Sequence, residues 1–178
     1  MIYVEEYSTP DGLDDLRMAS DGAVLTALHF VESPGGRRLL ESGGLAGEVP
    51  VFSETRRWLD SYFAGDVPDW LPPYRIDGAT VFRREVLELL RKVPFGQTTS
   101  YGALAQCIAR RHGVPKMSAQ AVGGAVGWNP LCIVIPCHRV IGADGGMTGY
   151  GGGLSNKVAL LRHEALYSKS SRREAHVP

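Results

Sequence analysis

A stretch rich in proline and glycine divides the chain near its middle. Residues 64–78 contain three prolines and two glycines, which interrupt regular helices and strands. A chain of 178 residues is long enough for one or two small domains. We therefore expect an N-terminal domain over residues 1–78, which includes this linker, and a C-terminal domain over residues 79–178.

The two halves carry opposite charge, although the formal net charge of the chain is zero. Residues 1–80 contain 6 Lys and Arg against 14 Asp and Glu, and residues 81–178 contain 13 against 5, which gives net charges of −8 and +8. A basic half is typical of proteins that bind a polyanion such as nucleic acid. It could equally dock on the acidic half, and charge alone favours neither interpretation.

The first half is predicted to be a small α/β domain, because short alternating segments are followed by one helical pattern. The expected elements are a strand over residues 3–7, a hairpin of residues 16–19 and 24–30, a loop over residues 33–50 and a helix over residues 54–63. The loop is expected because residues 33–50 are rich in Gly, Ser and Pro.

The second half is predicted to be mostly helical. The expected elements are helices over residues 81–92, 100–113 and 119–127, a strand over residues 131–135, a glycine-rich loop over 142–153, a helix over 155–166 and a polar, frayed tail over 167–178. Ser100 and Ser118 are suitable N-caps for the second and third helices. These two helices and their short connection resemble a helix-turn-helix, a weak pattern by itself because many helix pairs only pack together.

Cys137 is a candidate nucleophile. It follows Pro136 at the end of the apolar run 131–135 and precedes His138. In a regular strand the side chains of Cys137 and His138 would point to opposite faces. Pro136 allows the chain to turn there, and a bridging water is then the expected proton route between the two groups. The alternative is a buried structural cysteine beside a core histidine.

Glu164 is a candidate partner for His138. It lies at i+4 from Leu160 and i+3 from Leu161, on the apolar side of the last helix. A carboxylate there needs a partner, because an unpaired buried charge is costly. A relay of Glu164, His138, water and Cys137 would favour a thiolate at neutral pH. The alternative partners of Glu164 are Arg162, Lys157 and Arg139.

The cysteines and the N-terminus indicate the compartment. The chain has three cysteines, Cys107, Cys132 and Cys137, an odd and sparse set that fits a reducing cytoplasm better than a disulfide scaffold. No Cys/His cluster has zinc spacing, so we expect no metal. Residues 1–6 lack the basic and apolar stretches of a secretion signal, and no apolar run is long enough to span a membrane.

Seven blocks of sequence, spread over most of the chain, form a family pattern. They are Tyr62–Gly65, Ser100–Ala105, Ala121–Val126, Asn129–Pro130, Pro136–Val140, Thr148–Gly153 and Ala159–Glu164. Together they resemble the O6-alkylguanine-DNA alkyltransferases, which are the methylated-DNA–protein-cysteine methyltransferases. The block Pro136–Val140, with Asn-Pro upstream, is the most specific part of this resemblance.

The resemblance implies a DNA repair protein. Its members bind double-stranded DNA through a helix-turn-helix in the minor groove, largely without regard to sequence, and flip the damaged guanine out of the stack. The alkyl group then moves from O6 of guanine, and by extension from O4 of alkylthymine, to cysteine by direct displacement. The product thioether is a poor leaving group, so the protein is used once and needs no cofactor. The resemblance also implies a ribonuclease H-like N-terminal domain and a monomer in the cytoplasm.

The resemblance assigns roles to the residues of the active site. Cys137 matches the alkyl acceptor, His138 the base that acts through water, and Glu164 the group that orients this base. Asn129 matches the residue that stabilises the turn before the acceptor. Tyr101 matches a tyrosine at the DNA backbone and the flipped base, where its hydroxyl would help guanine to leave. The alternatives are a core tyrosine for Tyr101 and a plain turn former for Asn129.

Further residues match the substrate pocket and the DNA-binding surface. The carbonyls of Cys137 and Val140 would accept from the guanine amine. The pocket lining would include Tyr150, Gly151 and Gly152, whose alternative is a plain loop. The expected DNA contacts are Ala119 and Gln120 in the recognition helix and Arg110, Arg111 and Lys116 around the turn.

The chain departs from the family pattern at several positions. Many relatives carry an arginine where this sequence has Gln120, which we expect to fill the gap left by the flipped base with less phosphate attraction. Trp128 stands where some relatives have a glycine, and it either packs in the core or contacts DNA. Residues 110–116 form a longer turn than usual. The glycines Gly123, Gly124 and Gly127 lower helix propensity, which indicates either close approach to the minor groove or tight packing on the second helix.

Two other functions compete with alkyl transfer. Alkyltransferase-like proteins bind alkylated DNA without reacting, but they usually carry another residue at the acceptor position, where this chain has Cys137. A Cys-His hydrolase would need an oxyanion hole, which the glycine-rich loop could supply, but it would leave the helix-turn-helix and the basic half unexplained.

Overall fold

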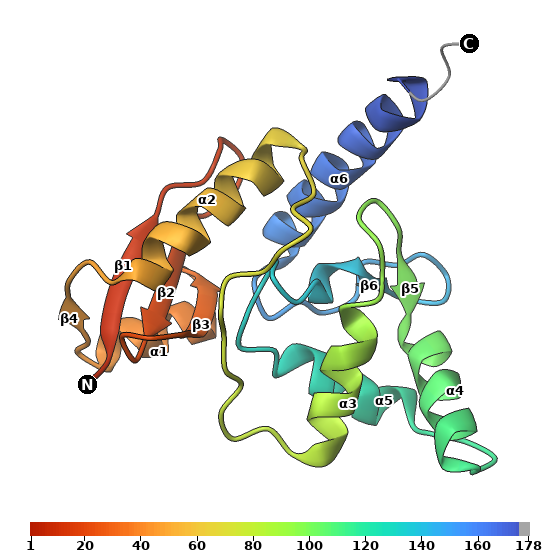
Figure 1. Ribbon diagram of the computed structural model, residues 1–178. Coiled ribbons are helices and arrows are strands. Elements are labelled where there is room, and N and C mark those ends of the chain that lie inside the picture. The colour runs from red at the N-terminus through yellow and green to blue at the C-terminus, as the bar shows by residue number, and fades with distance from the viewer. Residues whose placement is uncertain (175–178) are drawn as a thin grey trace.

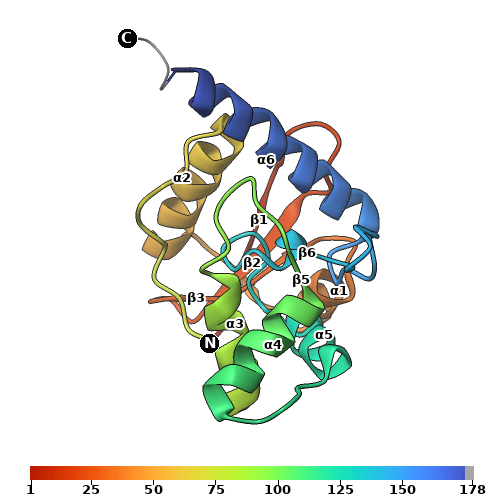
Figure 2. The same cartoon turned by 90° about the vertical axis from the view of Figure 1, so that its right-hand side faces the viewer.

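The computed structural model describes residues 1–174 and shows an α/β fold. A small sheet with two helices forms one side of the molecule, and four further helices form the other (Figure 1). The long last helix, α6 (Leu154–Glu174), runs beside α2 and joins the two sides (Figure 2). Among the described residues no helix is long and apolar enough to cross a membrane.

The N-terminal sheet has four strands in the order β3-β2-β1-β4. These strands are β1 (Tyr3–Tyr7), β2 (Leu16–Ser20), β3 (Leu25–Phe30) and β4 (Leu45–Ala46). β2 is antiparallel to both neighbours, with Met18 opposite Glu5 on β1 and Leu28 on β3, whereas β4 pairs parallel to β1. The predicted strand and hairpin are therefore confirmed.

The predicted loop over residues 33–50 is wrong, because it contains the helix α1 (Pro34–Glu41) and the strand β4. The Ser33 side chain caps α1 by accepting from the Gly36 amide. A Cβ at Gly35 would lie 2.5 Å from the His29 ring, and one at Gly36 would lie 2.1 Å from the Phe30 carbonyl oxygen. The glycines therefore permit close packing of a helix on β3, a tertiary reason that their composition does not reveal.

The expected helices of both halves are present. They are α2 (Pro50–Ala64), α3 (Val81–Leu90), α4 (Tyr101–His112) and α5 (Ala119–Gly127). Ser100 and Ser118 cap α4 and α5 by accepting from backbone amides, as expected. α2 begins four residues earlier than predicted, at Pro50. The predicted frayed tail is wrong up to Glu174, because α6 continues to that residue, and its last four residues lie outside the described range.

The predicted strand over residues 131–135 is also wrong. Only Leu131 pairs, as an isolated bridge to Leu28 on the free edge of β3. The chain then turns, with the Ile135 amide bonded to the Leu131 carbonyl at 2.9 Å and Ile133 at a φ of 67°. A short 3-10 helix, η1 (Cys137–Arg139), follows, and β6 (Val140–Ile141) pairs with β5 (Thr99–Ser100).

The N-terminal sheet directly holds the segment that precedes η1. The Leu28 amide donates to the Pro130 carbonyl at 2.8 Å, and the Cys132 amide donates to the Leu28 carbonyl at 2.9 Å. The free edge of β3 therefore fixes the start of the turn that leads to Cys137. The buried apolar residues also form one continuous cluster, from Leu16 on β2 to Leu160 on α6.

A second link joins the N-terminal half to the glycine-rich loop. The buried Asn156 side chain donates to the Asp14 carboxylate at 2.8 Å and to the Gly152 carbonyl at 2.7 Å, and it accepts from the Asp14 amide at 2.9 Å. One amide thus ties the first turn of α6 to both the loop and the N-terminal half.

Replacing Asn156 should destabilise the protein. We expect Asn156→Ala to lower the free energy of unfolding by about 1–3 kcal/mol, because it leaves buried hydrogen-bonding groups without partners. Urea denaturation measures this change. Ser155→Ala, at an exposed neighbour, is the control and should change little, and an equal effect of both substitutions would contradict the proposed link.

Candidate active site

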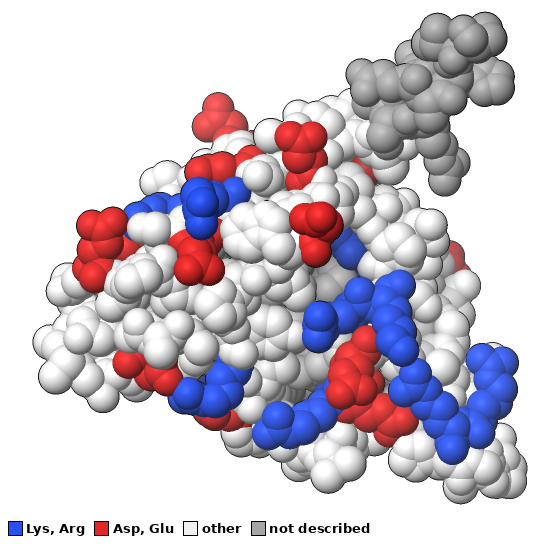
Figure 3. All heavy atoms as spheres, in the orientation of Figure 1, with Lys and Arg blue, Asp and Glu red and all other residues white. Residues whose placement is uncertain are grey.

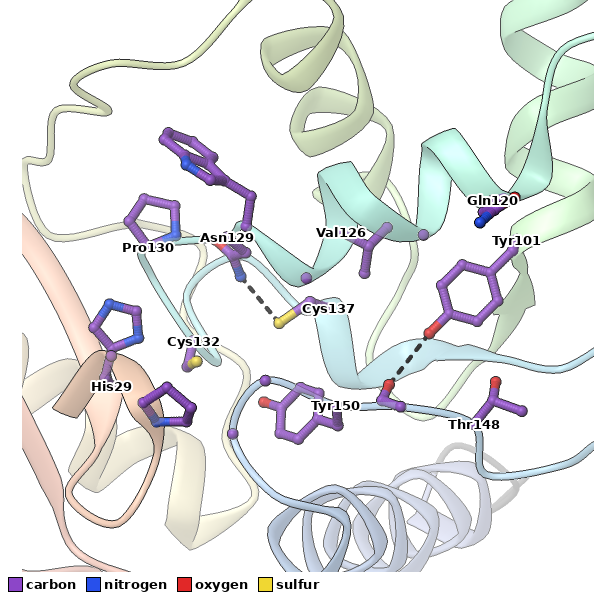
Figure 4. A pocket seen from close by; sticks show the side chains of 18 of the residues that line it. His29, Tyr101, Gln120, Val126, Asn129, Pro130, Cys132, Cys137, Thr148 and Tyr150 are labelled. Atoms are coloured by element: carbon purple, nitrogen blue, oxygen red, sulfur yellow. Dashed lines mark hydrogen bonds between the residues drawn. The ribbon is translucent and has the colours of Figure 1, made fainter. Parts of the chain in front are cut away.

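A cavity of about 840 Å³ lies between α5, the glycine-rich loop and α1 (Figure 4). Its size lies within the usual range for small-molecule sites. Most of the residues expected in the site line it: Tyr101, Ala119, Gln120, Asn129, Cys137, Tyr150, Gly151 and Gly152. The N-terminal half contributes part of the wall through His29, Pro34, Gly35 and Arg38, which the sequence did not predict.

Cys137 lies in this cavity at the start of η1, with 4% of its surface exposed. Its sulfur accepts a hydrogen bond from Asn129 Nδ2 at 3.0 Å. A hydrogen bond from the Cys132 thiol is the largest influence on the pKa of Cys137, and with the bonds from Asn129 and Tyr150 it outweighs burial and lowers this pKa to about 7. A substantial fraction of Cys137 is therefore thiolate at neutral pH.

Asn129 organises the turn before Cys137. Its Nδ2 donates to the carbonyls of Leu131 at 3.2 Å and Ile135 at 2.8 Å, and its Oδ1 accepts from the Leu131 amide at 3.1 Å. The same Nδ2 reaches the Cys137 sulfur. One buried amide thus shapes the backbone and contacts the thiol.

Glu164 lies at the centre of a buried polar cluster below the cavity. Its Oε1 lies 2.7 Å from His138 Nε2 and accepts from the Tyr62 hydroxyl at 2.8 Å and from Arg139 Nη2 at 2.8 Å. Its Oε2 accepts from the Gly96 amide at 2.9 Å. Both the expected partner His138 and the alternative Arg139 therefore bind this carboxylate.

The charges of this cluster are balanced. Burial would raise the pKa of Glu164, but the bonds and charges of His138 and Arg139 lower that pKa to about 2. Burial lowers the pKa of His138, and Glu164 only partly opposes it. His138 is therefore neutral at pH 7, and its Nε2 proton faces Glu164.

His138 Nδ1 is then the free base of this imidazole. It is buried and hydrogen-bonds to no other described residue. His138 is fully buried and does not line the cavity, and within the described residues no hydrogen bond joins its side chain to Cys137. The neighbouring side chains are thus separated, as expected from their awkward spacing in the chain.

Lys157 is a buried cation that the sequence placed only among the alternative partners of Glu164. Its Nζ instead donates to the Thr148 carbonyl at 3.0 Å and lies 5.9 Å from the centre of the Tyr150 ring. Burial lowers the pKa of Lys157, and the negative charge of Cys137 opposes this shift. Lys157 therefore holds the glycine-rich loop and adds positive charge near the thiolate.

Two tyrosines flank the thiol from the loop side. The Tyr101 hydroxyl, on the first turn of α4, donates to the Gly149 carbonyl at 3.4 Å. Burial, and then the charge of Cys137, raises the pKa of Tyr150 well above its ordinary value, so this hydroxyl stays protonated. A Cβ at Gly152 would lie 2.5 Å from the Tyr150 ring and 2.7 Å from Phe30, so only glycine fits there.

Val140 is fully buried, and its amide donates to the Cys137 carbonyl. This carbonyl, which the sequence assigned to the guanine amine, is thus already engaged once and retains one lone pair.

The surface of α5 near the cavity is open. A Cβ at Gly124 or Gly127 would meet no heavy atom within 4 Å, and one at Gly123 would only touch the Tyr101 ring at 3.7 Å. Tight packing on α4 therefore does not explain these glycines. Trp128 is partly buried, lines the cavity and lies under the Arg83 guanidinium at 4.6 Å from the ring centre.

The basic residues around the turn differ in their surroundings. Lys and Arg gather over the α3 and α4 side of the molecule, with Glu among them (Figure 3). Arg110 and Lys116 are exposed. Arg111 lies 3.7 Å from Glu85 on α3, which also binds His112 at 2.8 Å. Glu85 therefore neutralises part of the charge that the sequence counted as available.

Comparisons with known proteins agree with this arrangement. A family model described as 6-O-methylguanine DNA methyltransferase, DNA binding domain, matches residues 81–166. The methylated-DNA--protein-cysteine methyltransferase of Mycobacterium leprae is 38% identical over 171 residues, which cover 94% of this chain and 97% of the relative.

Solved structures are similar over nearly the whole chain. The Mycobacterium tuberculosis O6-methylguanine methyltransferase has a TM-score of 0.77 at 36% identity and covers 94% of each chain. A structure of Mycobacterium tuberculosis OGT in complex with DNA has a TM-score of 0.77 at 36% identity, over 93% of this chain and 94% of that one. The fold and the buried thiol thus define a cysteine-based methyltransferase class. The chain belongs to the methylated-DNA–protein-cysteine methyltransferase family.

Removing the charge of Glu164 should destabilise the protein in a pH-dependent way. We expect Glu164→Gln to lower the free energy of unfolding at pH 7 by about 3–5 kcal/mol, because Arg139 loses its buried partner. The pKa of Glu164 is depressed, so its stabilisation is complete above its ordinary value of 4.5 and is lost as pH falls toward about 2.

The stability difference between the two proteins should therefore shrink across that acidic range. Urea denaturation at a series of pH values measures it. Glu32→Gln, which removes an exposed partner of Arg37, is the control. A difference that stays constant from pH 7 to pH 3 would contradict the assigned charge state.

Proposed function

We propose that this protein repairs alkylated DNA by transferring the alkyl group from O6-alkylguanine, and from O4-alkylthymine, to Cys137. The observation that carries the proposal is a thiol with a pKa of about 7 in a cavity of nucleobase size, beside the open face of α5. Family membership supports the same activity. We place the protein in the cytoplasm.

The reaction is a direct displacement at the alkyl carbon. The Cys137 thiolate attacks this carbon, the bond from carbon to O6 breaks, and a thioether forms. The electron pair of the broken bond stays on guanine, which takes up a proton, and we assign its donation to the Tyr101 hydroxyl. The thioether does not release the alkyl group, so each protein acts once, and the chemistry requires no cofactor.

His138 and Glu164 prepare the nucleophile in this proposal. His138 Nδ1 takes the thiol proton through one water, and the Glu164 carboxylate holds the imidazole by its Nε2 proton and balances the charge that forms. The 2.7 Å contact between Glu164 and His138, with a neutral imidazole, supports this assignment. Asn129 holds the turn and the sulfur, and Lys157 holds the loop that closes the pocket.

The substrate pocket and the DNA surface complete the assignment. The Val140 carbonyl and the free lone pair of the Cys137 carbonyl accept from the guanine amine, while Tyr150, Gly151 and Gly152 line the base. We infer that α4 and α5 act as a helix-turn-helix that places Ala119 and Gln120 in the minor groove of double-stranded DNA. Arg110 and Lys116 contact phosphates, and Arg111 contributes less because of Glu85.

The organisation expected from the sequence belongs to the same proposal. We take residues 1–78 as a ribonuclease H-like domain with its linker, residues 79–178 as the DNA-binding and acceptor domain, and the whole as a monomer. The antiparallel strands β1 to β3 with a parallel edge strand support the first assignment.

Mass spectrometry tests the transfer directly. Mixing the protein with duplex DNA that contains O6-methylguanine should add one methylene unit to the intact protein, on the peptide that contains Cys137. Cys137→Ser should show no gain, and Cys107→Ser should react as the wild type does. No mass gain by the wild type would indicate a non-reacting binder, and hydrolysis of an ester substrate would indicate the Cys-His hydrolase.

Gln120 should matter only when a base must be flipped. It is exposed at the rim of the cavity, where its amide can hydrogen-bond the orphaned cytosine. Gln120→Ala should slow methyl transfer from duplex DNA by about tenfold, the loss of roughly one hydrogen bond. It should leave the reaction with free O6-benzylguanine unchanged. Single-turnover rates on both substrates measure this, and an equal loss on both would refute the flipping role.

A further inference from the structure

Two of the three cysteines share the cavity. Cys132 and Cys137 both line it, and each is 4% exposed (Figure 4). Their side chains are joined by a hydrogen bond from the Cys132 thiol to the Cys137 sulfur. Cys107, on α4, is not among the lining residues. The cavity therefore holds a pair of adjacent sulfur atoms, of which alkyl transfer needs one.

The backbone between these cysteines brings them together. In the strand expected from the sequence, residues five apart would point to opposite faces and lie about 16 Å from each other. The chain instead folds back, with the Val134 amide bonded to the Cys132 carbonyl at 2.8 Å and Ile133 at a φ of 67°. This left-handed conformation is rare for a β-branched residue. The pairing of the sulfur atoms thus depends on the turn.

The two sulfur atoms differ in chemical state. Cys137 has a pKa of about 7 and is partly thiolate at neutral pH, chiefly because Cys132 donates to it. The same hydrogen bond, and then burial, raises the pKa of Cys132 well above its ordinary value, so Cys132 remains a thiol. A thiolate reacts with peroxides, and a neighbouring thiol can capture the oxidised product before it reacts further.

We propose that Cys132 is a resolving cysteine, which protects oxidised Cys137 as a reversible disulfide. The Cys137 thiolate attacks a peroxide oxygen, the O–O bond breaks, and Cys137 sulfenic acid and hydroxide (or an alkoxide) form. The Cys132 sulfur then attacks the sulfenic sulfur, the S–O bond breaks, and the oxygen leaves as water with the Cys132 proton and the sulfenic proton. A cellular dithiol later restores both thiols.

The geometry suits this exchange. The sulfur atoms already lie within hydrogen-bonding reach, so a disulfide requires a local shift and not a refolding of the turn. The shift breaks the bond from Asn129 to the Cys137 sulfur, while the bonds from Asn129 to the Leu131 and Ile135 carbonyls can persist. The oxidised form would be unable to accept an alkyl group, because the acceptor sulfur is engaged.

The competing explanation is that Cys132 only donates to the thiolate. In that case peroxide would convert Cys137 to sulfinic acid, which thiols do not reduce, whether or not residue 132 is a cysteine. The two explanations therefore predict different oxidation products of the same protein.

Peptide mapping after peroxide treatment separates them. Trypsin should release residues 117–139, with both Cys132 and Cys137, and residues 93–110, with Cys107. After hydrogen peroxide and blocking of free thiols, the wild-type peptide 117–139 should be lighter by two hydrogens and unblocked. Dithiothreitol should restore its thiols. Cys132→Ser, which keeps a hydroxyl donor, should instead accumulate sulfinic acid at Cys137, and dithiothreitol should not reverse it.

The matched control is Cys107→Ser, which should give the same disulfide as the wild type. Sulfinic acid in the wild type at the rate seen in Cys132→Ser would overturn the proposal, as would a disulfide that includes Cys107. This readout needs no DNA, so it is independent of the proposed alkyl transfer. A parallel assay should show methyl acceptance from DNA lost after peroxide and regained after dithiothreitol in the wild type alone of the two.

Discussion

The buried carboxylate of Glu164 is the interaction on which the site depends. It receives Tyr62 from α2, Gly96 from the turn before β5, and His138 and Arg139 from η1. A carboxylate buried among these groups is stable only if its partners stay in place, because losing one leaves an uncompensated buried charge. One side chain of α6 therefore fixes the orientation of the residues that follow Cys137 and ties them to the N-terminal half.

The N-terminal half then has a physical role in the site. Leu28 on the free edge of β3 accepts from Cys132 and donates to Pro130, and Asp14 binds Asn156 beside the glycine-rich loop. Both walls of the cavity thus rest on the N-terminal sheet or its connections. An unpaired edge strand is ordinarily a liability, and here part of it serves as the template for the turn that presents the acceptor sulfur.

The limits of sequence interpretation follow from this division of labour. The helices α3, α4 and α5 are predictable because their apolar spacing and their Ser or Thr caps are local signals. The pairing of His138 with Glu164 is predictable from an acidic residue on an apolar helix face. The turn at residues 131–135 is not, because a short apolar run fits a buried strand as well as a buried turn, and Asn129 and β3 decide between them. The burial of Lys157 and the contact between Cys132 and Cys137 leave no local signal either.

The surroundings of Cys137 set a compromise between ionisation and reactivity. Burial opposes a thiolate, and the donors Cys132, Asn129 and Tyr150 oppose burial. These donors are neutral, whereas the cation Lys157 is held by the loop and Arg139 by Glu164. A thiolate paired directly with a cation would have a lower pKa but would also be a weaker nucleophile, and the most effective attacking thiol has a pKa near the ambient pH. A buried sulfur surrounded by neutral donors meets that condition, and this is why a second thiol is a suitable neighbour for the first.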